Sequence, residues 1–557
     1  MRVVVLTWPS RAVAPTAIRF ASRRCSLPQE LLGHLCAYAA ALPFRARSKL
    51  ESWFVSAECA PAVMDAWLKG LQQFITISVF QAERTATKAD VQGVTDAIKF
   101  MAVVHAANVV AEKAGALKVE FAGFYNDAVN DELFHIRNNT EFVRTAYREW
   151  QADCKYLADR KLAAARGGAA EDYSADEDWR PASFLSYPFI LSPATKAKVL
   201  QIDATQQMNR GVQSQLVTMM MSGRQLVPYL ILRVRRDHVV EDAMRIIAQS
   251  PKEDLKKPLK VVFQGEEGID EGGPAKEFMQ IVTRELLDPQ FAMFKSYDES
   301  RLLYFNAQTF EIGLEFELIG TLVGIAIFNS IILNLPFPIA VYKRLKDEDW
   351  APTLDDLSEL DPSLARSLEK MRAFDGDVEA TFGQTFQVSV EAFGGVQTYE
   401  LEEGGEEKPV TNANVKDYVE KYARFVLVDS VKAQLVAFRK GFMRVCGGTA
   451  LELFRPEELE LLVCGNPVLD FEALERCTHY EDGFEQDSAA MKHFWTVVHS
   501  FSEMEKRLLL KFFSGSDRAP IEGLSKMMFV ISRQGPDSDQ LPTVMHVVNT
   551  PFLARAY

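Results

Sequence analysis

The residues of this sequence with the strongest intrinsic chemistry are its cysteines. A thiolate is both a nucleophile and a metal ligand, so the spacing of the cysteines decides which role is open. The chain has seven, none in a C-x-x-C pair, at positions 25, 36, 59, 154, 446, 464 and 477. This odd, scattered set predicts neither a disulfide framework nor a zinc site. It indicates reduced thiols in a cytosolic or nuclear protein, and we expect no metal and no cofactor.

Other motifs that could carry chemistry give weaker signals. The segment EEGIDEGGPAKEF (266–278) is a turn leading into a helix, with Pro274 near the first helical turn. It is not a phosphate loop, because no G-K-[ST] follows and its acids would repel a phosphate. The arginines of RVRRDH (233–238) allow a nucleic-acid-binding interpretation, although such a cluster is more often a solvated face. No G-x-S-x-G elbow or H-E-x-x-H helix occurs, so an unrelated hydrolase is not indicated.

Length and composition limit the classes of protein to which this chain can belong. The chain has 557 residues, 48% hydrophobic and 25% charged, which predicts a folded protein of two or three domains. This balance excludes a wholly disordered chain, a collagen-like chain and a coiled-coil rod. A net charge of −14 argues against broad nucleic-acid binding.

The apolar periodicity predicts the elements that must position any site. Residues 30–115 repeat apolar residues every three or four positions, which predicts stacked antiparallel helices. His105 on this apolar face is expected to be packed in the core. Residues 318–333 form an apolar run that is short for a bilayer and predicts a buried helix. Further elements are expected as strands at 259–265 and 526–534, a hairpin over 385–393 and 397–405, helices at 414–443, 454–465 and 489–512, and loops at 514–520 and 535–543.

Several segments, taken in order, closely resemble the HECT domain of ubiquitin-protein ligases. The likeness begins near residue 228 and is specific, because many independent motifs keep their order and spacing. The markers are PYLILRVRRDHVVEDAM (228–244), DEGGPAKEF (270–278), LIGTLVGIAIFNS (318–330), FPIAVYKRL (337–345), FRPEELELLVCG (454–465), FWTVVHSF (494–501), GSDRAP (515–520) and GPDSDQLPT (535–543).

Upstream segments resemble the type of HECT ligase that associates with a papillomavirus oncoprotein, the Angelman-syndrome type. They are FYNDAVNDEL (124–133), FLSYPFILSPATK (184–196) and the helical region near 64–110. That type also has a small amino-terminal zinc domain. No cysteines here supply it, so no zinc is expected.

The resemblance implies an α+β fold, with a mainly helical amino-terminal region followed by a bilobal HECT domain. Residues 1–29 are expected to be disordered, or to result from a wrongly placed start of the gene. Residues 30–227 would be helical, with an exposed acidic loop near 160–180. The large, mostly helical N-lobe would span 228–480, and the small α/β C-lobe 481–557, truncated at its carboxyl end. The hinge between the lobes would fall at Glu481, Asp482 and Gly483.

The family docks a ubiquitin-conjugating enzyme on its N-lobe, and the matching positions here form an apolar stripe. The segment SLARSLEKMRAF (363–374) places four apolar residues on one helical face. By spacing alone this stripe would be core. With the resemblance we expect a partly exposed groove. Its predicted residues are Leu364, Leu368, Met371, Phe374, Phe382 and Tyr418.

In the family, a C-lobe cysteine accepts ubiquitin as a thioester and passes it to a substrate lysine. Here the matching position, six residues after Leu541, is Val547, preceded by His546. Valine has no lone pair and forms no thioester, so no catalytic residue is predicted. Cys446, Cys464 and Cys477 precede the C-lobe and are expected to be structural thiols. His546 has no nucleophile to activate and is expected to be a loop residue.

Two interpretations of the missing cysteine stay open. Either the sequence departs from the true reading just after Thr543, where the likeness decays abruptly, or the protein is a genuine pseudoligase that binds without transferring. The abrupt decay favours the first. The expected partners are a ubiquitin-conjugating enzyme, ubiquitin and a protein substrate, with no nucleic acid and no membrane. Substrate identity is not readable, although specificity is expected within residues 30–227.

Overall fold

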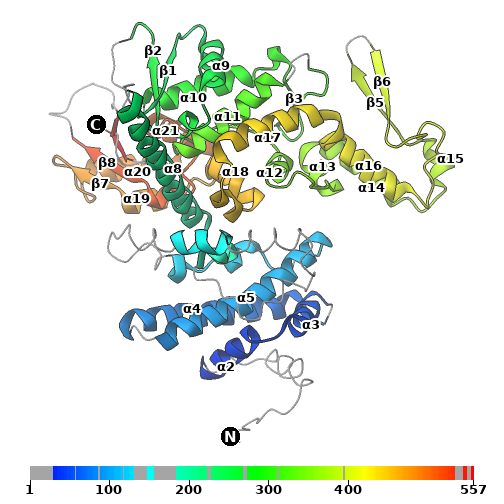
Figure 1. The fold of residues 1–557 in the computed structure, drawn as a ribbon, viewed down its shortest axis with the longest axis horizontal. Coiled ribbons are helices and arrows are strands. Elements are labelled where there is room, and N and C mark those ends of the chain that lie inside the picture. Colours follow the sequence, from blue (N-terminus) through cyan, green and yellow to red (C-terminus); the bar gives the residue numbers. More distant parts are fainter. Residues whose placement is uncertain are drawn as a thin grey trace, which may run out of the picture. The chain divides into compact units, whose positions relative to one another are not determined.

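The structure is a computed structural model of the whole chain. It describes residues 29–56, 58–85, 88–116, 118–130, 147–155, 184–222, 228–266, 273–309, 313–392, 395–533, 544–547 and 553–556. The chain divides into two compact units, Met1–Val199 and Leu200–Tyr557, which are treated separately below (Figure 1). The expected disordered start, the acidic loop near 160–180 and the loop at 535–543 lie outside the described residues.

The first unit is helical, as predicted for residues 30–115. Its helices are α2 (Gln29–Ala40), α3 (Phe44–Val55), α4 (Pro61–Thr85) and α5 (Lys88–Lys113), followed by short 3-10 turns at Phe121–Phe124, Phe184–Ser186 and Pro188–Ile190 and by the start of α8 (Pro193–Ser222). The central helix is α5, which packs against α2, α3 and α4. Within the described part of the chain, only its segment Gln92–Lys113 is long and apolar enough to cross a membrane. That segment is 56% buried, as expected of a core helix.

His105 of α5 lies in an aromatic cluster, in agreement with its predicted packing role. Its ring stacks on Phe189 with 4.7 Å between centroids. The rings of Phe121 and Phe124 meet it edge-on at 5.6 and 5.1 Å. The cluster therefore ties α5 to the 3-10 turns that follow it.

The second unit begins with a small parallel pair of strands. β1 (Leu230–Val234) and β2 (Leu259–Phe263) pair in parallel and are flanked by α9 (Val239–Gln249) and α10 (Gly273–Leu286). The antiparallel pair β3 (Phe294–Tyr297) and β4 (Leu302–Phe305) follows. The expected strand at 259–265 is therefore confirmed, ending at Phe263.

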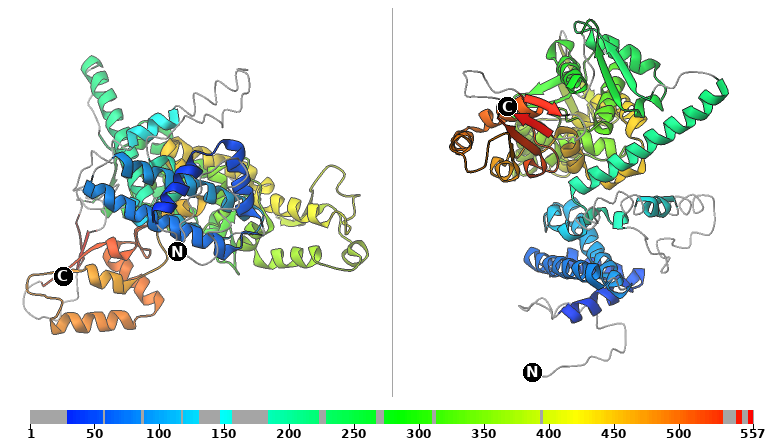
Figure 2. Two further views of the ribbon diagram at one scale, coloured as in Figure 1. Left: turned by 90° about the horizontal axis from the view of Figure 1, so that it is seen from below. Right: turned by 90° about the vertical axis from the view of Figure 1, so that its left-hand side faces the viewer.

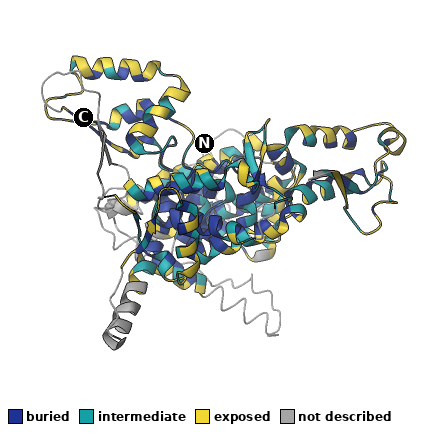
Figure 3. Cartoon of the chain, turned by 90° about the horizontal axis from the view of Figure 1, so that it is seen from above, coloured by how far each residue is buried: buried dark blue, intermediate teal, exposed yellow. Residues whose placement is uncertain are grey.

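The centre of the second unit is the pair α11 (Leu314–Phe328) and α17 (Lys432–Cys446). Every residue of α11 from Leu318 to Phe328 is buried, which confirms the predicted buried helix. The helix ends earlier than predicted, because Asn329 turns its side chain back: Nδ2 donates to Ile325 O at 2.8 Å, and Oδ1 accepts from Leu259 N at 2.8 Å. Figure 3 shows the chain coloured by burial, with buried residues in dark blue.

Two glycines allow α11 and α17 to touch backbone to backbone. A Cβ added at Gly320 would lie 1.9 Å from Phe438 O, and one added at Gly441 would lie 1.8 Å from Glu317 O. Only a residue without a side chain fits at either position. Helices α12 (Ile339–Lys346) and α18 (Pro456–Cys464) pack against this pair and against each other.

An arm extends from this centre, at the right of Figure 1. It carries α13 (Leu354–Leu360), α14 (Pro362–Arg372), α15 (Val378–Phe382), the antiparallel hairpin of β5 (Gln387–Ala392) and β6 (Gly395–Glu400), and α16 (Val415–Leu427). The hairpin confirms the predicted one. The helix predicted over 414–443 is instead divided into α16, a 3-10 turn at Asp429–Val431, and α17.

The last elements share a hydrophobic cluster of their own. They are α19 (Phe471–Cys477), β7 (His479–Glu481), α20 (Ala489–Ser500), α21 (Glu503–Ser514), β8 (Met528–Ser532), β9 (Val544–Val547) and β10 (Leu553–Ala556), coloured orange to red in Figure 2. The sheet order is β7-β8-β10-β9, with only β9 antiparallel to its neighbour. Every buried member of the cluster lies between Leu469 and Ile531. We call this cluster and its elements the C-terminal core.

One predicted helix of this core is two helices. The stretch 489–512 breaks before Ser502, whose hydroxyl and backbone N–H form a capping box with Glu505 and so start α21. The predicted loop at 514–520 and the strand at 526–534 are confirmed, the strand as Met528–Ser532.

Candidate functional site

Helix α14 starts where the sequence requires it. Asp361 caps its amino terminus, with the carboxylate accepting from Leu364 N at 2.9 Å, and Pro362 occupies the first helical position. The cap fixes the residue at which the helix begins. Helix α14, which carries the predicted stripe, packs against α16.

The structure brings all six predicted docking residues onto the arm, but it does not expose them equally. Leu368, Met371 and Tyr418 are buried, and they lie on α14 and α16, two helices that pack against each other. The expectation of a partly exposed groove is therefore wrong for these three, which are packing residues. Tertiary contact decided this, because an apolar stripe has the same spacing whether or not a neighbouring helix covers it.

The exposed part of the predicted site is an aromatic pair. Phe374 follows α14 and is 38% exposed, while Phe382 ends α15 and is half-buried. Their rings meet edge-on with 5.3 Å between centroids. Gly376 between them leaves space for the Phe374 ring, since an added Cβ would lie 2.5 Å from it. Leu364 is half-buried beside them in sequence. Leu364, Phe374 and Phe382 are named here the docking surface.

A second group of contacting aromatic rings, called here the aromatic seam, involves α16. Of its residues, only Tyr418 is predicted from the sequence. Tyr418 meets Phe386 edge-on at 5.4 Å and Tyr422 at 5.8 Å. Tyr422 is half-buried, and burial raises its pKa above the ordinary value, as it does that of Tyr418. The signal that could have found Tyr422 is its position one helical turn after Tyr418.

A cluster of charged residues packs against the aromatic seam. Glu402 accepts hydrogen bonds from the ammonium groups of Lys408 and Lys421. These two hydrogen bonds hold the pKa of Glu402 below its ordinary value. Both ammonium groups also lie over the Phe386 ring, at 4.2 and 5.5 Å from its centroid. The cluster therefore ties the loop after β6 to α16.

The predicted hinge residues lie within the C-terminal core, and not between two packed regions as expected. Glu481 is the last residue of β7 and pairs with Ser532 of β8. The Asp482 carboxylate accepts a hydrogen bond from the Ser532 hydroxyl, and Gly483 follows in a left-handed turn with φ of 98°. These three residues are thus the end of β7 and the turn after it, within the C-terminal core, and the structure does not support a hinge there. The misleading signal was composition, because glycine and acids suit a tight turn as well as a joint.

The position that the family resemblance implies for the nucleophile is in β9. Val547 is the last residue of that strand, with Leu553 of β10 as its register partner, and His546 is opposite Ala554. His546 is therefore on a strand, and its prediction as a loop residue is wrong.

The candidate substitute thiols are packed groups. Cys446 and Cys464 are buried, and burial raises the pKa of both above the ordinary thiol value. Burial also raises the pKa of Cys477. A raised pKa lowers the thiolate fraction at neutral pH, which agrees with structural roles. Among the described residues, no group of three or more His, Cys, Asp or Glu is placed to hold a metal ion.

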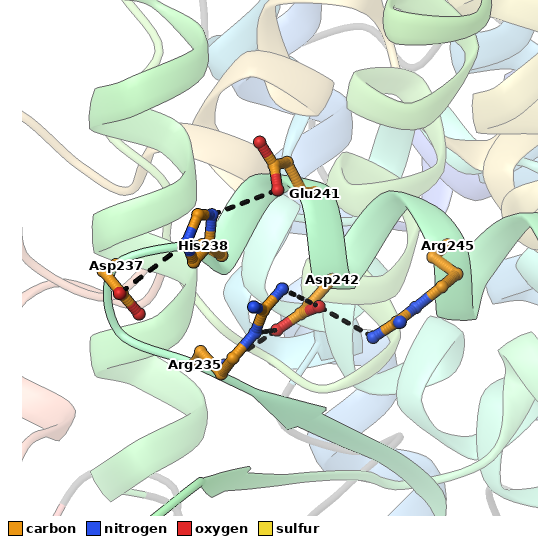
Figure 4. A network of polar contacts seen from close by, with 6 residues as sticks. All are labelled: Arg235, Asp237, His238, Glu241, Asp242 and Arg245. Carbon is orange, nitrogen blue, oxygen red and sulfur yellow. Dashed lines mark hydrogen bonds and ion pairs between the residues drawn. The ribbon is translucent and has the colours of Figure 1, made fainter.

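The arginines after β1 form ion pairs with carboxylates, some of which are drawn in Figure 4. Asp242 of α9 is buried and accepts from Arg235 Nε at 3.0 Å and from Arg245 at 2.7 Å. The Arg235 guanidinium holds the pKa of Asp242 well below its usual range. Arg236 binds Glu266 and Glu277 and lies over the Phe263 ring. These arginines are occupied in joining β1, α9 and α10, which weakens the nucleic-acid-binding interpretation.

Comparison with known proteins shows which family the second unit resembles. Residues 280–550 match the family described as HECT-domain (ubiquitin-transferase). Residues 280–550 are therefore similar to the ubiquitin-transferase domain of HECT ligases.

Three relatives illustrate the extent of the match. The chain is 37% identical over 452 residues to the probable E3 ubiquitin-protein ligase HERC4 of Mus musculus, covering 80% of this chain and 40% of the relative. It is 39% identical over 376 residues to the probable ligase HECTD2 of Homo sapiens, covering 65% and 48%. It is 38% identical over 388 residues to the probable ligase mug30 of Schizosaccharomyces pombe, covering 64% and 48%. The chain thus spans less than half of each relative's length, and these relatives do not support the expected papillomavirus-associated type.

Proposed function

We propose that this protein docks a ubiquitin-conjugating enzyme on the docking surface of its arm but, with Val547 at the nucleophile position, forms no ubiquitin thioester itself. The observation that carries the proposal is the HECT match over residues 280–550 together with an exposed aromatic pair on the arm. Exposed aromatic rings beside packed apolar residues are typical of the centre of a protein interface.

The chemistry explains why residue 547 decides activity. In the HECT reaction a thiolate attacks the carbonyl carbon of the thioester on the conjugating enzyme, and the enzyme's own thiolate leaves. A substrate lysine amine then attacks the new thioester and expels the thiolate, leaving an isopeptide bond. Valine offers no lone pair for the first step, so ubiquitin stays on its carrier.

We further propose that the C-terminal core is the small lobe of a bilobal HECT domain. Its separate hydrophobic cluster between Leu469 and Ile531 supports this arrangement. The reaction would need such a lobe to approach a carrier bound on the arm, and a joint between two cores allows that approach.

The transfer step is tested by incubation with a ubiquitin-charged conjugating enzyme, followed by non-reducing gels. We expect no reducible ubiquitin adduct on the protein as it stands. We expect one on Val547→Cys if β9 presents residue 547 as the family does. A robust adduct on the unaltered chain would refute the claim of inactivity. Adduct on neither protein, with docking intact, would support the scaffold interpretation.

The docking step needs a variant that leaves the fold intact, which excludes the buried Leu368. Phe374→Ala removes a ring that is 38% exposed, and we expect it to weaken binding by about 1–3 kcal/mol in calorimetry. The matched control is Phe291→Ala, which removes a ring that is 55% exposed in a 3-10 turn outside the arm. Equal affinities for Phe374→Ala and the unaltered protein would refute docking at this surface.

The remaining partners follow from the same proposal. Ubiquitin would arrive on its carrier, and a protein substrate would be selected by residues 30–227. The described cysteines are free of disulfides, which suits the cytoplasm or the nucleus, and this is the localisation we propose.

A further inference from the structure

We propose that the outer face of α21 binds an acidic amphipathic helix of a partner protein. This inference concerns the C-terminal core alone and does not rest on the proposed function. Three features of α21 carry it: apolar residues on two faces, unpaired cations along one flank of the outer face, and a helical conformation that is fixed at both ends.

Helix α21 has apolar residues on two faces, and the core uses only one of them. Leu510 and Phe513 are buried members of the cluster of the C-terminal core. Met504, Leu508 and Phe512 are instead 68%, 59% and 51% exposed, and their spacing of four residues places them on one side of the helix. We call these three residues the outer stripe. Apolar side chains that gather on an exposed face are typical of protein interaction sites.

The charges beside the outer stripe select the kind of partner. Arg507 and Lys511 each lie three residues after a member of the stripe, so both cations are on the same flank of it. Within the described part of the chain, neither side chain makes an ion pair or a hydrogen bond, whereas Lys506 of the same helix pairs with Glu503 at 3.1 Å. Carboxylates on a partner helix would complement these two cations.

The same charges disfavour a second copy of this chain as the occupant. Two copies of α21 packed antiparallel about a two-fold axis would bring the same flank of each helix together, so Arg507 and Lys511 would face like charges. Parallel packing would bring them to Glu505 on the other flank, but that carboxylate already accepts from the Ser502 hydroxyl and backbone N–H at 2.7 and 2.8 Å. The acids at the amino end of α21, Glu503 and Glu505, also fit poorly against an anionic lipid surface.

Helix α21 is ordered before any partner binds. Its amino end is closed by the capping box of Ser502 and Glu505. Its carboxyl end is closed by Gly515, which has φ of 80° and donates its N–H to a helix carbonyl at 2.9 Å. The inner face is packed, with 4.6 Å between the ring centroids of Phe513 and Phe529. Because the helix is already fixed, little of its conformational freedom is lost on binding.

Binding of a synthetic helix to the full chain tests this assignment. The probe is a fluorescein-labelled peptide of about 20 residues, long enough to form a helix, with leucine on one face and glutamate on both flanks. We expect saturable binding in fluorescence anisotropy, weakened about tenfold by Phe512→Ser. The double variant Arg507→Glu/Lys511→Glu should weaken binding of this peptide about tenfold and strengthen binding of a second peptide that has lysine in place of glutamate.

The matched controls alter residues on other elements near or within the same core. Val468→Ser replaces an exposed apolar side chain before α19. Arg476→Glu/Lys526→Glu reverses an exposed arginine and an exposed lysine, which changes the net charge as much as the test variant does. Both controls should leave the affinities for the two peptides unchanged.

Three results would overturn the proposal. Absence of saturable binding to the unaltered chain would show that the outer stripe does not accept an acidic helix. Equal weakening by the two double charge reversals would show that the attraction is non-specific. Self-association in sedimentation, or binding to vesicles of phosphatidylserine and phosphatidylcholine, that is lost with Phe512→Ser while the peptide does not bind, would assign the face to a second copy or to a lipid surface.

Discussion

Replacement of Gly441 by alanine is the sharpest test of how the second unit is held together. The added Cβ would lie 1.8 Å from Glu317 O and 2.9 Å from Thr321 N, both backbone atoms of α11. Real Cβ atoms essentially never come within 3.0 Å of another heavy atom, so α11 and α17 must move apart locally by more than 1 Å.

The size of the effect follows from two opposing contributions. Alanine in a helix interior is favoured over glycine by about 1 kcal/mol. Overpacking a well-filled core costs about 1–3 kcal/mol, and the cost is highest where rigid backbone is displaced rather than a side-chain tip. Since α11 is buried on all sides, separation also weakens contacts along its length. We expect a net loss of about 2 kcal/mol or more in the free energy of unfolding.

Urea denaturation followed by circular dichroism measures this loss. The matched control is Gly70→Ala in α4, where an added Cβ meets nothing within 4 Å. That variant should be neutral or stabilising by up to about 1 kcal/mol. If Gly441→Ala is as stable as Gly70→Ala, the backbone contact between α11 and α17 is not what the structure indicates.

Three further predictions concern the arm and its surroundings. Leu368→Ala should lower the free energy of unfolding by about 2–5 kcal/mol, whereas Phe374→Ala should change it little; equal losses by denaturation would contradict the packing role of Leu368. The ionised Glu402 stabilises the fold above its unfolded pKa of 4.5, and this contribution is lost as pH falls through the lower folded pKa. Glu402→Gln should therefore lower Tm at pH 7, and a Tm difference that does not shrink below pH 4.5 would refute the assignment. Thr353→Ala removes the cap of α13 and should cost about 1 kcal/mol in urea melts, with no loss expected for an exposed threonine such as Thr496.

Local chemistry made much of the fold predictable. The β5–β6 hairpin follows from alternating residues, the start of α18 from Pro456 with acids behind it, and the buried α11 from its unbroken apolar run. Helix boundaries were harder to place. The break before α21 depends on a single serine cap, and the end of α11 on one asparagine that bonds to β2. The asparagine bonds to a partner far away in the sequence, whereas the serine cap is local and forms its box with Glu505.

The sequence by itself determined the class of this protein, its helical first unit and the valine at position 547, because these follow from motif order, apolar period and residue identity. Tertiary structure alone decided which residues of the apolar stripe stay exposed, and that the arginines after β1 are already bound. The physical reason is that exposure and ion pairing are relations between segments far apart in the chain. Leu368 and Phe374 share one sequence pattern, yet the fold buries the first and leaves the second more than a third exposed.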